Sequence, residues 1–81
     1  MYYVYILRSA LNRSYYIGSC KNITNRFNQH NKGNVLSTRK GKPWELVYRE
    51  EYDTLKEARK REIQIKRWKS RYAIEKLLGR S

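Results

Sequence analysis

The stretch "SYYIGSCKNITNRFNQH", residues 14–30, decides the fold, because it joins a tyrosine-rich strand to a helix through one glycine. Arg26 and His30 lie one turn apart on that helix. A segment that serves only packing is normally built from Leu, Val and Ala, which bury area without a polar group to satisfy. The tyrosine, arginine and histidine gathered here therefore indicate a functional site as well as a structural element.

The residues before this stretch are predicted to pair with it as a β-hairpin. Residues 2–8, YYVYILR, are mostly β-branched or aromatic and contain no glycine or proline, which favours a strand covered on at least one face. Residues 10–14 form a short polar connection, and residues 15–19, YYIGS, form the second strand. This pairing brings Tyr5 and Tyr16 into the same neighbourhood.

The helix in the quoted stretch has recognisable ends. Asn22 is a suitable N-cap, and the helix is predicted to run to about Lys32, with Gly33 just past its end. Residues 33–43 contain two glycines and the only proline of the chain, with basic and hydroxyl side chains between them. They are predicted to form a positively charged loop.

A third strand is predicted over residues 44–52, WELVYREEY. Because side chains alternate along a strand, we expect Leu46 and Tyr48 on one face and Val47 on the other. The strand would pack beside the hairpin and complete a small antiparallel sheet.

Two helices are predicted after the third strand. Thr54, with a glutamate three residues later, forms a capping box for a helix that runs to about Trp68. Ser70 is a second N-cap, for a last short helix that stops at Gly79. The order ββαβαα predicts one α+β domain over residues 1–81, in which helices flank a three-stranded antiparallel sheet.

The charge of the chain limits its partner class. There are 19 Lys and Arg against 7 Asp and Glu, a formal net charge of +12, which points to a polyanion and foremost to nucleic acid. The longest apolar run, residues 2–7, is far too short to span a membrane, and no signal-peptide pattern begins at Met1. We therefore expect a cytoplasmic protein without a membrane partner. Cys20 is interpreted as a small buried hydrophobic residue.

An acid interrupts the apolar face of the longer predicted helix. At about 100° per residue, Leu55, Ala58 and Ile65 form one stripe, and Glu62 falls inside it. A buried carboxylate needs a compensating cation, which is either a metal ion or a basic residue. Lys66, one turn further on, is the basic candidate, and the residues alone leave both alternatives open.

Tyr5, Tyr16, Arg26, His30 and Glu62 together carry the chemistry of phosphodiester hydrolysis. That reaction needs an activated water, charge neutralisation at the phosphate and stabilisation of the departing oxygen. A carboxylate that holds Mg²⁺ and an arginine supply two of these, and a phenol or imidazole can take the proton of the water. The set therefore indicates a candidate nuclease site.

The motifs around these residues resemble those of the GIY-YIG endonuclease superfamily. The resemblance is to small single-domain members similar to the N-terminal nuclease domain of UvrC, the excision-repair nuclease of the excinuclease ABC system. Its motifs, in family order and over nearly the whole chain, are YVY at 3–5, YIG at 16–18, NRFNQH at 25–30 and EARKREIQIK at 57–66. Tyr3 stands where the family name has glycine.

This resemblance implies one Mg²⁺ or Mn²⁺ ion and DNA cleavage to a 5′-phosphate and a 3′-hydroxyl, in DNA repair or recombination. Tyr16 matches the tyrosine that is proposed in the family as general base or as the positioner of the attacking water. Arg26 matches the arginine that contacts the scissile phosphate, and Glu62 matches the glutamate that binds the metal. Tyr5 and His30 match accompanying active-site positions.

Other side chains are expected to contact the substrate. Gly18 lacks a side chain and would let a phosphate approach the sheet. The basic residues expected to bind the substrate are Lys21, Lys32, Arg39, Lys40 and Lys66. Family members commonly take their specificity from an attached domain or a partner, so a protein partner is expected beside DNA, and the protein itself is expected to be a monomer.

Two other functions would explain the charge. The main alternative is a non-catalytic nucleic-acid-binding module of the same fold, because phosphate contacts give affinity without cleavage. It would hold nucleic acid through Lys21, Lys32, Arg39, Lys40 and the basic helix after Thr54. A ribosome-associated basic protein is a third, but it leaves Tyr16, Gly18 and Glu62 as coincidences. Since both the acid and the arginine are present, an endonuclease is the preferred interpretation.

Overall fold

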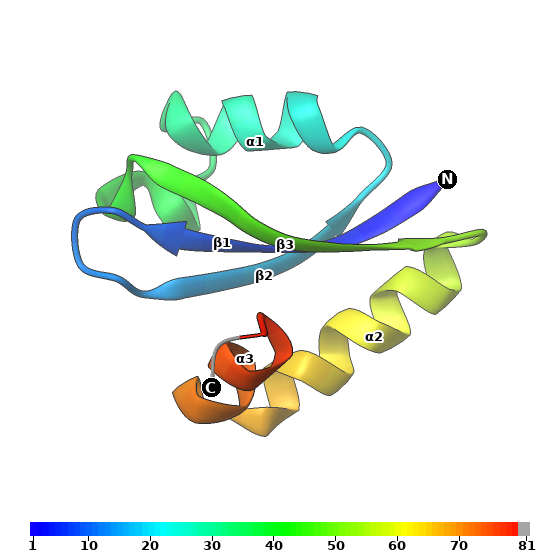
Figure 1. The fold of residues 1–81 in the computed structure, drawn as a ribbon. Helices are drawn as coiled ribbons and strands as arrows, with labels where there is room; N and C mark the ends of the chain where they lie inside the picture. Colours follow the sequence, from blue (N-terminus) through cyan, green and yellow to red (C-terminus); the bar gives the residue numbers. More distant parts are fainter. Residues whose placement is uncertain (80–81) are drawn as a thin grey trace.

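A three-stranded antiparallel sheet forms the middle layer of the protein, which the computed structural model describes for residues 1–79 (Figure 1). The strand order is β2-β1-β3, so β1 is central and β2 lies at one edge. The elements are β1 (Tyr2–Ser9), β2 (Tyr15–Cys20), α1 (Ile23–Asn31), the 3-10 helix η1 (Leu36–Gly41), β3 (Trp44–Tyr52), α2 (Leu55–Trp68) and α3 (Arg71–Leu77). The predicted α+β fold and the order ββαβαα are confirmed.

Helices cover both faces of the sheet (Figure 1). Alternation along β1 sends Tyr5 and Leu7 towards α1, where Ile23 and Phe27 pack against them. The other face is covered by α2 and α3, and its buried cluster is Val4, Ile6, Ile17, Ala58, Ile65 and Ile74. Within residues 1–79, no helix is both long enough and apolar enough to cross a membrane.

The helix starts follow the predicted caps. The side chains of Asn22, Thr54 and Ser70 each accept the backbone N–H three residues further on, at 3.0 to 3.2 Å. Gly33 has φ +80°, a backbone conformation that glycine adopts without strain, and it follows the end of α1. These local signals fix where α1, α2 and α3 begin.

The alternation predicted for β3 is wrong at Val47. Tyr48 pairs with Ile6 and Leu46 pairs with Leu7, so Val47 is an extra residue opposite the gap between them. This β-bulge turns the strand, and Leu46 and Tyr48 therefore fall on opposite faces of the sheet rather than on the same one. A bulge depends on the partner strand, and the sequence of β3 alone does not announce it.

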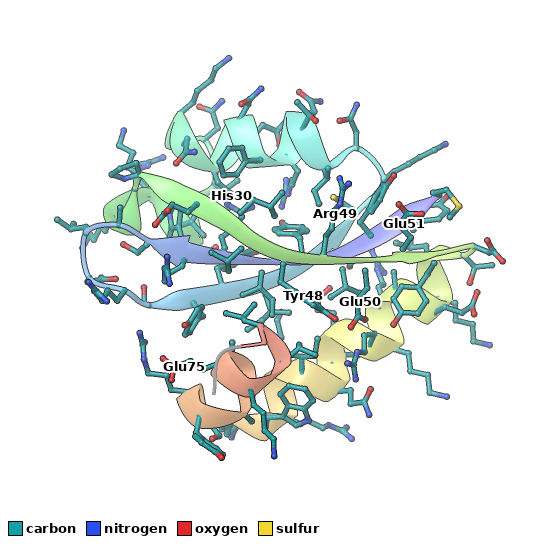
Figure 2. All side chains as sticks on the ribbon, in the orientation of Figure 1. His30, Tyr48, Arg49, Glu50, Glu51 and Glu75 are labelled. Atoms are coloured by element: carbon teal, nitrogen blue, oxygen red, sulfur yellow. The ribbon has the colours of Figure 1, made fainter. Side chains whose placement is uncertain are left out.

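A carboxylate on β3 ties the sheet to α2. Glu50 accepts hydrogen bonds from the hydroxyls of Tyr48 and Tyr52 and from Nε and Nη2 of Arg61, at 3.0 and 3.2 Å for the arginine. Figure 2 shows Tyr48 and Glu50 on the α2 side of β3. The Arg61 guanidinium also lies 5.6 Å from the Trp68 ring. These contacts fix the rotation of α2, and hence the direction of the residues on its faces.

The segment predicted as a loop over residues 33–43 contains η1. Hydrogen bonds hold η1 to the rest of the fold. Among them, Ser9 Oγ donates to the Gly41 carbonyl at 2.5 Å, Trp44 Nε1 donates to the Thr38 carbonyl at 2.8 Å, and Arg39 Nε donates to the Gly33 carbonyl at 3.0 Å. Short 3-10 segments often serve as connectors, and here tertiary contacts select one.

Two isoleucines on α2 test this packing. Ile65 is 0% exposed and Ile63 is 50% exposed. We expect Ile65→Ala to lower the free energy of unfolding by about 2 to 5 kcal/mol, because it leaves a cavity between α2 and the sheet. Ile63→Ala should change it by less than about 0.5 kcal/mol. Urea unfolding followed by circular dichroism measures both, and equal losses would contradict the described orientation of α2.

Candidate functional site

A cleft of about 310 Å³ opens at the edge strand β2. Helix α1 lies on one face of the sheet and α2 on the other (Figure 1). Side chains from both layers line the cleft. The lining residues are Tyr5, Tyr16, Gly18, Ser19, Arg26, Arg59, Glu62 and Ile63. Two phenols, two guanidinium groups and one carboxylate therefore converge on the same space.

Alternation along β2 divides its residues between the two layers. Tyr16 pairs with Leu7 and Gly18 with Tyr5, which places them on the α1 face. Ser19 points to the opposite face, where its hydroxyl donates to Glu62 Oε1 at 2.5 Å. The strand thus links the phenols on one side to the carboxylate on the other.

Gly18 makes room for the hydroxyl of Tyr5. A Cβ at position 18 would lie 2.6 Å from the Tyr5 hydroxyl oxygen and 2.7 Å from its Cζ, closer than Cβ atoms approach other atoms. Tyr5 is 1% exposed and has little freedom to move aside. Glycine is therefore required at this position of the YIG motif to accommodate the Tyr5 side chain, in addition to the expected close approach of a phosphate.

A chain of buried hydrogen bonds extends from Tyr5 into the protein. The Tyr5 hydroxyl lies 2.9 Å from His30 Nε2, and His30 Nδ1 lies 2.7 Å from Thr38 Oγ1. Thr38 donates its own proton to the Val35 carbonyl at 3.3 Å, so its oxygen accepts from His30 Nδ1–H. His30 Nε2 is then an acceptor, and Tyr5 donates its proton inward to it. The Tyr5 oxygen keeps its lone pairs for groups in the cleft.

The ionisation states of Tyr5 and His30 in this hydrogen-bonded series follow from their environment. Burial, helped by the positive charge of Arg26, lowers the pKa of His30 from 6.5 to about 4, so the imidazole is neutral at pH 7. Burial raises the pKa of Tyr5 to about 12, although Arg26 beside it acts in the opposite direction. Tyr5 is therefore a neutral phenol in the free protein.

Arg26 lies close to both phenols. It stands on α1 one turn before His30, and its pKa is raised chiefly by its interaction with the Tyr5 hydroxyl. Its Nη1 also donates to Gln29 Oε1 at 3.2 Å, which steadies the guanidinium. The Tyr16 and His30 rings pack with their centres 4.9 Å apart. This arrangement holds a positive charge on the α1 side of the cleft.

Glu62 is on the α2 side, with its side chain 18% exposed. Its Oε2 lies 2.6 Å from Lys66 Nζ, so the ion pair considered from the sequence is present, and Glu62 also lines the cleft. The Lys66 side chain is half exposed and is free to turn away into solvent. The Glu62 carboxylate therefore pairs with a cation and also faces the cleft.

The donor set of the cleft suits a hydrated magnesium ion. No group of three or more His, Cys, Asp or Glu side chains converges anywhere in residues 1–79, so a cage made wholly of protein ligands is not formed there. Mg²⁺ typically keeps several waters and uses one or two carboxylates together with substrate phosphates. Glu62 and the neighbouring Ser19 hydroxyl, beside an open cleft, fit that kind of site.

Comparison with known proteins assigns the chain to a family. The family model described as "GIY-YIG catalytic domain" matches residues 1–76. The chain belongs to the GIY-YIG family. It is 39% identical over 66 residues to a UPF0213 protein of Staphylococcus aureus and 41% identical over 66 residues to one of Staphylococcus saprophyticus, in each case 80% of this chain and 79% of the relative.

A solved structure supports the same relationship. The solution NMR structure of a UPF0213 protein from Bacillus halodurans matches with a TM-score of 0.61 at 31% identity, over 98% of this chain and 84% of that one. The GIY-YIG resemblance inferred from the sequence is therefore confirmed, and with it the ββαβαα fold.

The structure brings most of the predicted GIY-YIG site together. Tyr5, Tyr16, Gly18, Arg26 and Glu62 line the cleft. His30 lies behind the cleft, buried between α1 and the sheet (Figure 2). The five basic residues predicted to bind substrate are all exposed, and none of them lines the cleft: Lys21, Lys32, Arg39, Lys40 and Lys66. Their contact with substrate stays a prediction.

Sequence reasoning missed three positions in this GIY-YIG site. Arg59 lies one turn before Glu62 on α2, and the same helical wheel that located the acid could have found it. Ser19 could have been found by alternation along β2, since it follows Gly18 on the opposite face. Thr38 had no local signal, because only the folded η1 brings it to His30.

The only histidine in the chain makes this geometry directly measurable. We expect its NMR titration midpoint at about pH 4, with the proton of the neutral ring on Nδ1. Because the unfolded chain binds this proton more readily, stability should fall as the pH drops from 6.5 towards 4. Thr38→Val should shift the ring towards the other tautomer, whereas Thr38→Ser should not. A midpoint near 6.5 would contradict the buried Tyr5–His30–Thr38 chain.

Proposed function

We propose that the protein is a divalent-metal-dependent endonuclease that hydrolyses a DNA phosphodiester in the cleft around β2. One observation carries the proposal. Arg26 and Glu62 come from helices on opposite faces of the sheet, yet both line one cleft together with Tyr5 and Tyr16. A structural role for each residue separately does not account for their meeting at one edge strand. The net charge of +12 supports a polyanionic substrate.

The cations of the cleft act on the scissile phosphate. Arg26 on the α1 side and Arg59 on the α2 side can donate to the non-bridging oxygens from two directions. Their positive charge stabilises the negative charge that grows in the transition state. Glu62, with Ser19 beside it, would hold Mg²⁺ or Mn²⁺, which when bound neutralises phosphate charge and stabilises the departing oxygen.

The two phenols handle the attacking water. Tyr5 donates inward to His30, so its oxygen can accept a hydrogen bond from a water in the cleft. Tyr16 is only partly buried, and we assign it to orient the water and take its proton. The water oxygen bonds to phosphorus, the bond to the 3′ oxygen breaks, and the proton passes through Tyr16 and solvent to that oxygen. The products are a 5′-phosphate and a 3′-hydroxyl.

The proposed biological setting is DNA repair or recombination, where nicked, flapped and branched DNA arise. Each chain has one such cleft in its described part, and cleavage of one strand at a time requires only a monomer. A partner protein that selects the DNA site is compatible with the open cleft.

Glu62→Gln tests the proposal. It removes the carboxylate charge that would hold the metal, so we expect cleavage to fall at least about 100-fold while DNA affinity changes by less than about threefold. Glu57→Gln is the matched control, because it removes the same charge from an exposed position on α2 and keeps the capping box.

The measurement is cleavage of labelled duplex, nicked, flapped, branched and single-stranded DNA with Mg²⁺ or Mn²⁺. Cutting by the wild type and by Glu57→Gln, but not by Glu62→Gln, is the expected pattern. Undiminished cutting by Glu62→Gln would exclude it as the metal ligand. Binding by the wild type with no cutting of any substrate would favour the non-catalytic nucleic-acid-binding module.

A further inference from the structure

The outer face of α2 carries an unusual combination of side chains. Lys56, Lys60, Ile63 and Arg67 lie on the side of the helix opposite the buried Ile65, at spacings that stack them in one row. All four are exposed, and Ile63 is a large apolar residue half in solvent. Together with Arg59, which stands one turn before Glu62, they are named the α2 strip.

Within residues 1–79, the cations of the α2 strip form no ion pair with an acid. The ion pairs found within residues 1–79 are Arg8–Glu45, Arg61–Glu50, Lys66–Glu62 and Arg71–Glu75. None of these pairs takes a cation from the α2 strip, and the neighbouring Arg61 and Lys66 are the ones that neutralise acids. Four like charges on one face of a short helix repel each other, which favours an anionic ligand over bare solvent.

The α2 strip is continuous with the cleft. Arg59 and Ile63 line the cleft and also a shallow depression beside it, which includes Lys56 and Lys60. A second depression continues past Ile63 and Lys60 to Arg67. A chain molecule that leaves the cleft on the α2 side would therefore pass directly over these side chains.

We propose that the α2 strip binds the phosphate backbone of the nucleic-acid strand that leaves the cleft. The inference rests on the proposed function for its starting point, a scissile phosphate held in the cleft, but not on cleavage itself. The inference assigns binding of this nucleic-acid strand to α2, rather than to the basic side chains at the end of α1 and in η1.

The length of the α2 strip matches a run of phosphates. From Lys56 to Arg67 the helix rises about 16 Å, at roughly 1.5 Å per residue. Phosphates along one strand of a duplex are about 3.4 Å apart along the axis, so the strip spans about five of them. Lys56, Lys60 and Arg67, spread over that distance, can each take a separate phosphate. Ile63 between them offers an apolar contact for a sugar or an unstacked base.

The test is the salt dependence of binding, measured in EDTA so that no cleavage occurs. The probe is a fluorescein-labelled DNA hairpin with a single-stranded tail, followed by fluorescence anisotropy. The strip variant carries Lys56→Gln, Lys60→Gln and Arg67→Gln. The matched control carries Arg13→Gln, Lys42→Gln and Lys76→Gln, which are exposed positions outside the cleft and the strip. Both variants replace two lysines and one arginine.

Each phosphate contact adds about 0.7 to 0.9 to the slope of log affinity against log salt concentration. We expect the strip variant to lower the magnitude of that slope by about 2 to 3, and the control to lower it by less than about 1. Equal changes in both variants would overturn the proposal, because they would show that net charge alone sets the affinity. Failure of the wild-type protein to bind the probe at low salt would overturn it as well.

The outcomes separate this inference from the proposed function. A strip-specific loss of slope in a protein that cuts nothing would leave the α2 strip as a binding surface and remove the nuclease assignment. Cleavage by the wild type, with equal slopes in the strip and control variants, would keep the nuclease assignment. It would place the departing nucleic-acid strand on another surface of the protein. Unchanged circular dichroism of both variants shows that they are folded.

Discussion

The hydrogen bond from Tyr5 to His30 is the interaction on which the rest of the site depends. It connects the central strand to α1, and through Thr38 it reaches η1. It also decides the residue at position 18, because the Tyr5 hydroxyl occupies the space where a Cβ would stand. A buried pair of this kind is stable only when each polar atom has a partner, and no buried side-chain nitrogen or oxygen in residues 1–79 lacks one.

The small width of the sheet allows residues from both helical layers to meet beside the Tyr5–His30 pair. With only three strands, β2 is an edge, and residues on its two faces are separated by one strand thickness. Helices α1 and α2 can therefore present Arg26 and Glu62 to the same cleft although they lie in different layers (Figure 1). The Glu50–Arg61 contacts set the rotation of α2 on β3, and so they aim Glu62 towards β2 and the α2 strip towards solvent.

Local sequence signals correctly predicted the features that depend on residues close together in the sequence. The caps at Asn22, Thr54 and Ser70 located the three helices, and the helical wheel located Glu62 on an otherwise apolar stripe. The other features of the fold depend on contacts between residues far apart in the sequence. The bulge at Val47 depends on pairing with β1, and the predicted faces of β3 were wrong for that reason. The candidate site divides in the same way: sequence motifs indicated Tyr5, Tyr16, Arg26 and Glu62, which the structure places around one cleft. The role of Thr38 comes from its contact with His30, eight positions earlier in the sequence, for which the sequence carries no periodic signal.

The central claim is that groups from both helical layers act on one phosphate, and a double-mutant cycle tests it most directly. The variants are Arg26→Lys, Glu62→Asp and their combination, conservative changes chosen to leave a measurable rate. The quantity is the single-turnover rate constant on the DNA that the wild type cuts fastest. If both groups act on the same transition state, the two losses should be coupled by at least about 1 kcal/mol, roughly fivefold. Losses that simply multiply would show that Arg26 and Glu62 act independently, and would contradict a shared site at β2.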